Sequence, residues 1–279
     1  MAQARHSIEA ALSHALDASV DQHSARAVGG GSINEARRFH TDRGPIFVKS
    51  GAVSSREVFA AEAAGLHALA HTQTVRTPKV LAVGSWEQGA FIALEWIRLG
   101  PSTRSSEAVL GEQLAWQHRT TQPQFGWARD NTIGATPQPN TLCNEWVTFF
   151  RERRLRYQLT LATRNGADGE LSERGERLCE SLDAFFATYH PTPSLLHGDL
   201  WGGNWGTDED GLPVIFDPAV YFGDREADIA MTRLFGGFGH AFYAAYQSTW
   251  PLDPDVAVRS TLYNLYHVLN HYNLFGGDY

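Results

Sequence analysis

The sequence has few cysteines, no long apolar run and no block of basic residues. Its 279 residues include two cysteines, Cys143 and Cys179, which are far apart and lack Cys-x-x-Cys spacing. A disulfide framework and a cysteine zinc site are therefore both disfavoured, and the composition fits a reducing compartment. No apolar stretch approaches the length of a signal peptide or a membrane span. We therefore expect a cytoplasmic protein that has no membrane partner.

The charge balance is acidic. The chain has 23 Lys and Arg against 31 Asp and Glu, a net charge of −8, so electrostatic capture of nucleic acid is disfavoured. Hydrophobic residues make up 43% of the sequence, which is enough to bury a sizeable core in one large domain or two lobes. The partner is therefore expected to be a small or non-acidic molecule.

Three polar residues of the second half, Asp199, Asn204 and Asp217, lie where short apolar runs end. An amide five positions after the first carboxylate (204 minus 199) and a second carboxylate eighteen positions after it (217 minus 199) match the pattern of phosphoryl transfer. Asp199 would orient the acceptor hydroxyl and accept its proton, while Asn204 and Asp217 would hold Mg²⁺ through oxygen. Such residues also shape turns, but their combination favours the functional interpretation.

Glycines in the first half separate two extended segments. Residues 23–28 and 33–40 are predicted to be strands joined by a turn that contains Gly30 and Gly31. Backbone N–H groups of such a turn can approach phosphates. The full Gly-x-Gly-x-x-Gly spacing is absent, so an ordinary hairpin is the alternative interpretation.

A lysine and a glutamate of the next two elements are predicted to pair. In the strand that ends at Lys49, Phe47 and Lys49 share one face. In the helix predicted over 54–70, Glu62 lies within an apolar stripe, where a carboxylate needs a cationic partner. Pairing with Glu62 would orient Lys49 toward phosphates, although a purely structural ion pair is the alternative. Strands over 80–86 and 91–97 complete a small antiparallel sheet.

The second half is predicted to be mainly helical. Helices are expected over 105–119, 144–163 and 172–189, and Arg151, Arg153, Arg154 and Arg156 are interpreted as a solvated basic face. The long loop over 121–141 could line an acceptor pocket with Trp127, Asn131 and Gln138. His267 and His271 have the spacing of a zinc pair, but their aromatic neighbours favour core or pocket-edge histidines.

These motifs resemble the fructosamine kinase (ketosamine-3-kinase) family, relatives of the aminoglycoside phosphotransferases and distantly of protein kinases. The strongest likeness is His-Gly-Asp-Leu-Trp-Gly-Gly-Asn at 197–204, Phe-Asp-Pro-Ala at 216–219 and Gly-Asp-Arg-Glu-Ala-Asp at 223–228. It continues in Gly-Gly-Ser-Ile-Asn-Glu-Ala (30–36), Phe-Val-Lys (47–49), Leu-Glu-Trp-Ile (94–97), Phe-Gly-Trp (125–127), Asp-Asn-Thr-Ile-Gly (130–134), Thr-Pro-Gln-Pro-Asn (136–140) and Leu-Tyr-His-Val-Leu-Asn-His (265–271).

The resemblance implies an α+β, two-lobed protein-kinase-like fold. Residues 1–97 would form a nucleotide-binding lobe with a small antiparallel sheet, and residues 98–279 a mainly helical lobe with the catalytic loop and acceptor site. Mg·ATP would lie between the lobes, and Asp228 would tie down the catalytic loop. The implied nucleotide-binding residues are Gly30, Gly31, Ser32, Lys49, Glu62, Glu95, Trp96 and Ile97.

The implied activity is ATP-dependent phosphorylation of the 3-hydroxyl of a ketosamine, a ribulosamine or fructosamine adduct of an amine or lysine, in deglycation repair. Trp201 would offer a flat wall to the sugar, and a monomer is favoured. Ser32 replaces a cysteine found in some relatives, so redox-linked dimers are not expected. Two alternatives remain: a phosphotransferase of the same fold for an aminoglycoside, choline or homoserine, and a nucleotide-binding regulator without catalysis.

Overall fold

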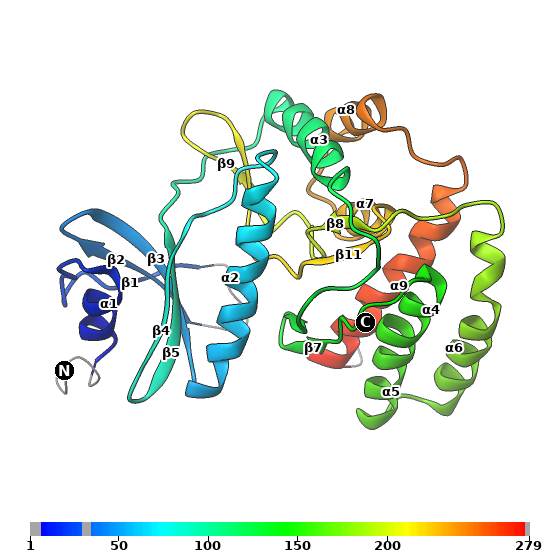
Figure 1. Ribbon diagram of the computed structural model, residues 1–279, viewed down its shortest axis with the longest axis horizontal. Helices are drawn as coiled ribbons and strands as arrows, with labels where there is room; N and C mark the ends of the chain where they lie inside the picture. Colours follow the sequence, from blue (N-terminus) through cyan, green and yellow to red (C-terminus); the bar gives the residue numbers. More distant parts are fainter. Residues whose placement is uncertain (1–6, 30–34, 277–279) are drawn as a thin grey trace. The chain divides into compact units, whose positions relative to one another are not determined.

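The computed structural model describes residues 7–29 and 35–276. The described residues divide into two compact units. The first consists of those within 1–101 and 206–216, and the second of those within 102–205 and 217–279. Figure 1 colours the elements of both along the chain. The first unit thus extends four residues beyond the expected boundary at 97 (101 minus 97), and it includes a hairpin that sequence reasoning placed in the other lobe. No helix of the described ranges is long and apolar enough to cross a bilayer.

The first unit is built on a five-stranded antiparallel sheet in the order β1-β2-β3-β5-β4. Its strands are β1 (Arg26–Ala27), β2 (Glu35–Thr41), β3 (Gly44–Gly51), β4 (Val80–Trp86) and β5 (Gly89–Glu95). The small antiparallel sheet predicted from the sequence is therefore confirmed. The first predicted strand is shorter than expected, because only its last residues pair with β2, at Arg26↔Arg38 and Ala27↔Arg37.

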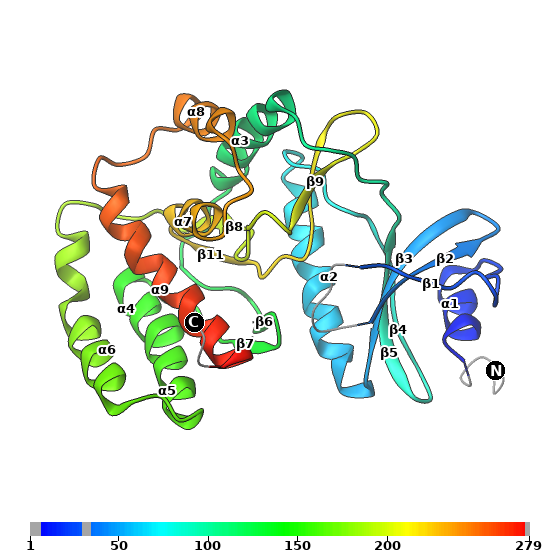
Figure 2. The same cartoon turned by 180° about the vertical axis from the view of Figure 1, so that it is seen from behind.

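Helices cover both faces of this sheet, as the two views in Figures 1 and 2 show. Helix α1 (Ile8–Leu16) packs with Ile46 and Val48 of β3 into one buried cluster. Helix α2 (Arg56–His71), which follows a short 3-10 turn (η2, Val53–Ser55), packs Phe59 and Leu66 against β5 on the other face. The alternation of β3 therefore directs Phe47 and Lys49 toward α2, as predicted.

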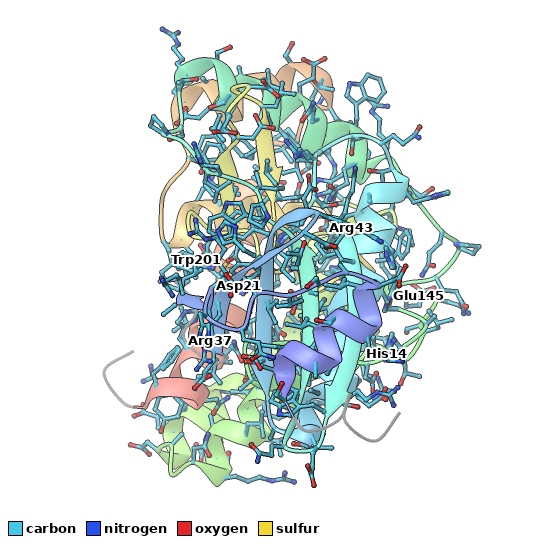
Figure 3. All side chains as sticks on the ribbon, turned by 90° about the vertical axis from the view of Figure 1, so that its left-hand side faces the viewer. His14, Asp21, Arg37, Arg43, Glu145 and Trp201 are labelled. Atoms are coloured by element: carbon cyan, nitrogen blue, oxygen red, sulfur yellow. The ribbon has the colours of Figure 1, made fainter. Side chains whose placement is uncertain are left out.

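Arg43, labelled in Figure 3, fixes the end of α1 to the β2–β3 turn. Its guanidinium donates to the carbonyls of Leu16 (3.4 Å) and Asp17 (2.6 Å). These are C-terminal carbonyls of the helix, which lack intrahelical donors. The turn thereby holds α1 on the sheet.

The hairpin of β9 (Trp205–Thr207) and β10 (Pro213–Ile215) is attached to the first unit by backbone and side-chain bonds. Ile215 N–H donates to the carbonyl of Arg76 (3.0 Å), and Gly100 N–H donates to that of Thr207 (2.6 Å). The Arg76 guanidinium also pairs with Asp208 of the hairpin and with Glu95. These bonds explain why residues 206–216 belong to the first unit although they lie between Asn204 and Asp217 in sequence.

The second unit is mainly helical, as predicted. Its elements are α3 (Arg104–His118), β6 (Asn131–Ile133), β7 (Thr136–Gln138), α4 (Trp146–Phe150), the π-helical turn η3 (Arg151–Leu155), α5 (Arg156–Arg164), α6 (Gly169–Ser181), the 3-10 segment η4 (Leu182–Phe186), β8 (Ser194–Leu196), β11 (Tyr221–Gly223), α7 (Glu226–Leu234), α8 (His240–Thr249) and α9 (Val256–Phe275). An aromatic core centred on Trp146, Phe150 and Tyr263 joins the helices to β11.

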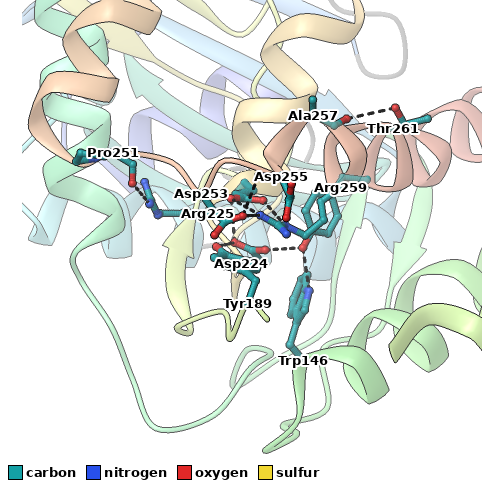
Figure 4. A network of polar contacts seen from close by, with 12 residues as sticks. Trp146, Tyr189, Asp224, Arg225, Pro251, Asp253, Asp255, Ala257, Arg259 and Thr261 are labelled. Carbon is teal, nitrogen blue, oxygen red and sulfur yellow. Dashed lines mark hydrogen bonds and ion pairs between the residues drawn. The ribbon is translucent and has the colours of Figure 1, made fainter. Parts of the chain in front are cut away.

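A buried polar network beside this core is drawn in Figure 4. Asp224 accepts hydrogen bonds from Tyr189 (2.9 Å) and Tyr263 (2.5 Å). Arg259 pairs with the buried Glu226 (2.7 Å) and with Asp253 (2.6 Å). Because buried charges are tolerated only when paired, the network fixes the start of α7 against α9.

The predicted solvated arginine face is wrong for Arg154, whose side chain is completely buried. Arg151–Leu155 form a π-helical turn, which inserts one extra residue per turn and shifts the following side chains around the helix axis. Arg151 and Arg156 form ion pairs with acidic side chains, as expected for the predicted face: Arg151 with Asp183, and Arg156 with Glu176. Regular helical periodicity cannot anticipate the shift, because it assumes 3.6 residues per turn.

Candidate active site

Lys49 and Glu62 form an ion pair within the first unit. The Nζ of Lys49 lies 2.7 Å from Oε1 of Glu62, and each side chain is only 11% exposed. Strand β3 and helix α2 bring them together because Lys49 occupies the α2-facing side of the strand and Glu62 the sheet-facing side of the helix. Glu57, by contrast, is exposed. The structure therefore contains the pair that the sequence pattern indicated.

Glu95, the last residue of β5, and Trp96 after it have side chains that contact other residues of the first unit. The carboxylate of Glu95 accepts from Arg76 (2.9 Å) and from the backbone N–H of Lys79 (3.2 Å). Glu95 N–H donates to the Lys79 carbonyl (2.8 Å). The Trp96 ring packs against Phe47 and beneath the guanidinium of Arg38. The Glu95 side chain is therefore committed to contacts within the first unit. Gly30, Gly31 and Ser32 lie outside the described residues.

In the second unit, Asp228 holds the start of the 197–204 loop. Its carboxylate accepts from the backbone N–H of His197 (2.7 Å) and of Gly198 (2.9 Å), and also from Nε2 of His118 (3.1 Å). Burial opposes ionisation of Asp228, but the hydrogen bond from His118, with further favourable interactions from His197 and the Gly198 N–H, outweighs it and lowers the pKa of Asp228. The expected supporting role of Asp228 is thus confirmed by these bonds.

The loop folds back on itself so that Asn204 contacts Asp199. Nδ2 of Asn204 donates to the backbone carbonyl of Asp199 (2.8 Å) and to its Oδ2 (3.2 Å). Trp201 N–H donates to the carbonyl of Asp199, and Asn204 N–H donates to that of Trp201. Two consecutive tight turns therefore bring the amide to the carboxylate. The amide nitrogen faces Asp199, which turns Oδ1 of Asn204 away from it.

Two backbone features place Asp217 next to this loop. Gly198 has φ +83°, and a Cβ at this position would lie 2.0 Å from the carbonyl oxygen of Ala219. Ala219 N–H donates to the carbonyl of His197 (2.8 Å). Asp217 itself has φ +58°, which is uncommon for a residue with a side chain. Glycine at 198 thus permits close contact between the loop and the segment that carries Asp217.

The proximity of two carboxylates changes the acidity of Asp199. The Asp199 side chain is half-buried. Loss of contact with water, together with the negative charge of Asp217, raises the pKa of Asp199 to about 7. The hydrogen bond from Asn204 lowers it in part. Two carboxylates that share a site repel one another and attract a cation. The described ranges contain no cluster of three or more His, Cys, Asp or Glu residues with metal-binding geometry.

Trp201 lies in the same loop, two residues after Asp199, and is labelled in Figure 3. Its side chain is 39% exposed. A Cβ at Gly203 would lie 2.3 Å from the indole ring, so the ring rests directly on the glycine backbone. The Phe235 ring meets its edge at a centroid distance of 6.4 Å. Trp201 is thus a partly exposed aromatic ring that is supported by the backbone of its own loop.

Comparison with known proteins agrees with this geometry. The model of the family described as "Fructosamine kinase" matches residues 4–279. The chain belongs to the fructosamine kinase family. The protein is therefore an ATP-dependent kinase of the two-lobed α+β fold, as predicted.

Three relatives of this kinase illustrate the similarity. A "Probable ketoamine kinase" of Synechocystis sp. is 45% identical over 91% of the chain and 85% of its own length. The chloroplastic "Protein-ribulosamine 3-kinase" of Arabidopsis thaliana is 43% identical over 91% and 78%. The crystal structure of a "Putative fructosamine-3-kinase" from Haemophilus somnus superposes with a TM-score of 0.90 at 29% identity, over 98% and 92%.

Sequence reasoning missed one buried histidine of this kinase that supports the site. His118 is completely buried and bridges Asp228 to the hydroxyl of Tyr246 (2.8 Å). His118 lies at the end of α3, 110 residues before Asp228, so no local sequence pattern indicates that the two side chains meet.

Gln138 was expected in an acceptor pocket, but its side chain is 1% exposed and its polar atoms are bonded within the protein, so that expectation is wrong.

Proposed function

We propose that the kinase transfers the γ-phosphate of ATP to the 3-hydroxyl of a ketosamine carried by an amine or a lysine side chain. The observation that carries the proposal is the grouping of Asp199, Asn204 and Asp217 in a chain of the fructosamine kinase family. The names of the Synechocystis and Arabidopsis relatives support a ketosamine acceptor and, for the latter, a ribulosamine attached to protein.

Asp199 is proposed as the catalytic base. Its carboxylate would accept a hydrogen bond from the acceptor hydroxyl and orient that oxygen toward the γ-phosphate. It would take up the hydroxyl proton as the new P–O bond forms and the bond between the γ-phosphorus and the departing ADP breaks. In the metal-free protein the pKa of this carboxylate is raised to about 7, and bound Mg²⁺ would lower it by reducing the repulsion from Asp217. The two turns and the bonds from Asn204 restrict its position, so that little reorganisation is needed.

Asn204 and Asp217 are proposed as the protein ligands of Mg²⁺. An amide oxygen and a carboxylate fit this ion, which takes one or two protein oxygens and completes its octahedron with water and phosphate oxygens. The geometry supports the assignment because the amide nitrogen of Asn204 faces Asp199. When bound, the ion would neutralise phosphate charge and reduce the repulsion between Asp199 and Asp217.

The nucleotide is proposed to bind through the first unit. Lys49, oriented by Glu62, would contact the phosphates as the corresponding ion pair does in protein kinases. The carbonyl of Glu95 and the N–H of Ile97 would recognise adenine, since residues two apart in an extended segment direct their backbone groups to the same side. The turn containing Gly30, Gly31 and Ser32 remains proposed as a phosphate contact. Trp201 would support the sugar of the acceptor.

A panel of acceptors tests the proposal. Purified protein with ATP and Mg²⁺ is incubated with ribuloselysine, fructoselysine, a glycated peptide, free sugars, an aminoglycoside, choline and homoserine, and phosphate incorporation is measured. Turnover of one or more ketosamines with little of the others is the expected result. Turnover of choline, homoserine or an aminoglycoside alone would favour the other phosphotransferases. ATP binding without turnover of any acceptor would favour a nucleotide-binding regulator.

A further inference from the structure

Five buried or half-buried side chains of the second unit form one hydrogen-bonded cluster, which we call the amide network. Its members are Asn131, Gln138, Asn140, Arg154 and Tyr266. They come from the β6–β7 hairpin, from the loop after it, from the π-helical turn and from α9. Figure 2 shows this hairpin beside the end of α9. The segments 130–134 and 136–140 stood out in the sequence, and neither has a role in the site described so far.

Gln138 is the centre of the network, and its amide is bonded on both sides. Nε2 donates to Oδ1 of Asn131 (2.9 Å) and to the carbonyl of Ala219 (3.1 Å), while Oε1 accepts from the hydroxyl of Tyr266 (2.7 Å). Burial raises the pKa of Tyr266, so that the phenol remains a donor. The donor at Tyr266 and the two oxygen acceptors fix which way the Gln138 amide points.

Asn131 makes the second contact with the same backbone segment. Its Nδ2 donates to the carbonyl of Val220 (2.8 Å), while its Oδ1 accepts from Asn140 (2.8 Å) as well as from Gln138. Consecutive carbonyls at 219 and 220 are therefore each held by an amide of the β6–β7 hairpin. Ala219 N–H donates in addition to the carbonyl of His197 (2.8 Å).

Arg154 holds the loop after β7 through Pro139 and Asn140. It is completely buried, donates to Oδ1 of Asn140 (2.7 Å) and to the carbonyl of Pro139 (2.7 Å), and lies over the ring of Tyr221 at 4.1 Å. Within the described ranges no carboxylate lies at ion-pair distance from it. Carbonyl, amide and aromatic contacts therefore stabilise the cation, which makes the loop after β7 part of a rigid base.

Only Pro218 separates these held groups from Asp217. Proline fixes its own φ, so few backbone rotations remain between the Asp217 Cα and the carbonyl of Ala219. Asp217 also has φ +58°, a conformation that persists in a residue with a side chain when the surroundings impose it. The amide network and the His197 carbonyl together supply that constraint.

We infer that Gln138 and Asn131 are positioning residues for Asp217 and set the affinity of the kinase for its catalytic divalent cation. The inference rests on the proposed function only in taking Asp217 as a metal ligand. The two amides hold the carbonyls of Ala219 and Val220, and this fixes the direction in which the Asp217 carboxylate leaves the backbone. Substituting a residue that orients a metal ligand typically weakens metal binding about 10-fold to 100-fold.

Two variants test the inference. Gln138→Met keeps the volume of the side chain and removes its three bonds. Asn131→Ser removes the bond to Val220 together with the amide oxygen that accepts from Gln138 and Asn140. Thr232→Val is the matched control, because it removes a fully buried hydroxyl in the same unit that bonds to Ile229 (2.7 Å) and Tyr243 (3.2 Å). Melting temperature reports how far each substitution disturbs the fold.

The decisive readout is the dissociation constant of Mn²⁺, measured by electron paramagnetic resonance with a non-hydrolysable ATP analogue and without an acceptor. We expect Gln138→Met to weaken Mn²⁺ binding about 10-fold, and Asn131→Ser by a smaller factor, with no change in Thr232→Val. In turnover assays the Mg²⁺ concentration for half-maximal rate should rise in parallel, with the ketosamine KM at saturating Mg²⁺ unchanged.

Unchanged Mn²⁺ affinity in folded Gln138→Met would overturn the inference, as would the absence of Mn²⁺ binding by the unsubstituted protein. If Gln138→Met does not fold, Asn131→Ser decides by the same criterion. Because the binding measurement contains no acceptor, it is separate from the assignment of the substrate. Altered Mn²⁺ affinity in a protein that phosphorylates no ketosamine would leave the positioning role standing and refute the proposed acceptor alone.

Discussion

Replacing Asp199 by asparagine should abolish phosphoryl transfer and, in the absence of metal, make the protein more stable. The carboxylate is partly buried close to Asp217, and the pKa of Asp199 is raised from 3.8 to about 7. Between pH 3.8 and about pH 7, Asp199 therefore keeps its proton in the folded protein but has lost it in the unfolded chain. As pH rises from 3.8 to about 7, the folded state loses stability relative to the unfolded chain, and above this range the loss is constant.

The magnitude follows from that shift. Three pKa units correspond to about 4 kcal/mol at about 1.4 kcal/mol per unit, and partial exposure of the carboxylate reduces this to about 1 to 3 kcal/mol. Asn keeps the shape of the side chain and carries no charge, so Asp199→Asn should recover most of this free energy. A gain of this size corresponds to a rise in melting temperature of about 2 to 10 °C for a protein of this length.

The assay is thermal unfolding in chelator from pH 5 to pH 8. The difference in melting temperature between Asp199→Asn and the unsubstituted protein should grow with pH and level off above about pH 7. Asp210→Asn, which removes an exposed carboxylate from the β9–β10 turn, controls for loss of a negative charge and should change stability by no more than about 0.5 kcal/mol. A less stable Asp199→Asn, or a difference that does not vary with pH, would refute the reasoning.

Three further substitutions separate the parts of the site. Glu62→Gln should weaken nucleotide binding about 10-fold by calorimetry and leave the acceptor KM unchanged, because Lys49 loses the partner that orients it; a change in acceptor KM alone would contradict this. Asp228→Asn should lower the free energy of unfolding by about 2 to 4 kcal/mol in denaturant titrations at pH 7, because a carboxylate that accepts three hydrogen bonds is lost. Since the pKa of Asp228 is lowered in the folded state, the difference should shrink as pH falls through that pKa, and a difference that grows would count against the assignment. Trp201→Ala should raise the ketosamine KM severalfold with the KM for ATP unchanged, and equal changes in both would remove the indole from the acceptor site.

The strands β2 to β5 and the helix α2 of the first unit were predictable because each depends on short-range periodicity. Alternation along β3 separates Ile46 and Val48 from Lys49, and the apolar stripe of α2 includes Glu62. A strand and the helix after it must then bring the lysine and the glutamate together. The pair follows from local pattern and from the cost of burying an unpaired carboxylate.

The support behind Asp217 could not be predicted, because its contacts join segments more than 80 residues apart. Gln138 bonds to the carbonyl of Ala219, and a glutamine in a polar loop carries no signal that it will be buried. Arg154 is buried because a π-helical turn shifts its direction, which sequence periodicity cannot show. The β9–β10 hairpin belongs to the first unit through isolated backbone hydrogen bonds to Arg76 and Gly100 and through the Arg76–Asp208 ion pair. These contacts also lack a sequence pattern.

The most direct test of the central claim is the position of the phosphate in the product. Ribuloselysine is incubated with the protein, Mg²⁺ and γ-labelled ATP, and the product is characterised by ³¹P–¹H correlation NMR and mass spectrometry. We expect one phosphate, coupled to the proton on carbon 3 of the sugar, in the product of the unsubstituted protein, and no such product with Asp199→Asn. Phosphate on another hydroxyl, or equal product with Asp199→Asn, would contradict it.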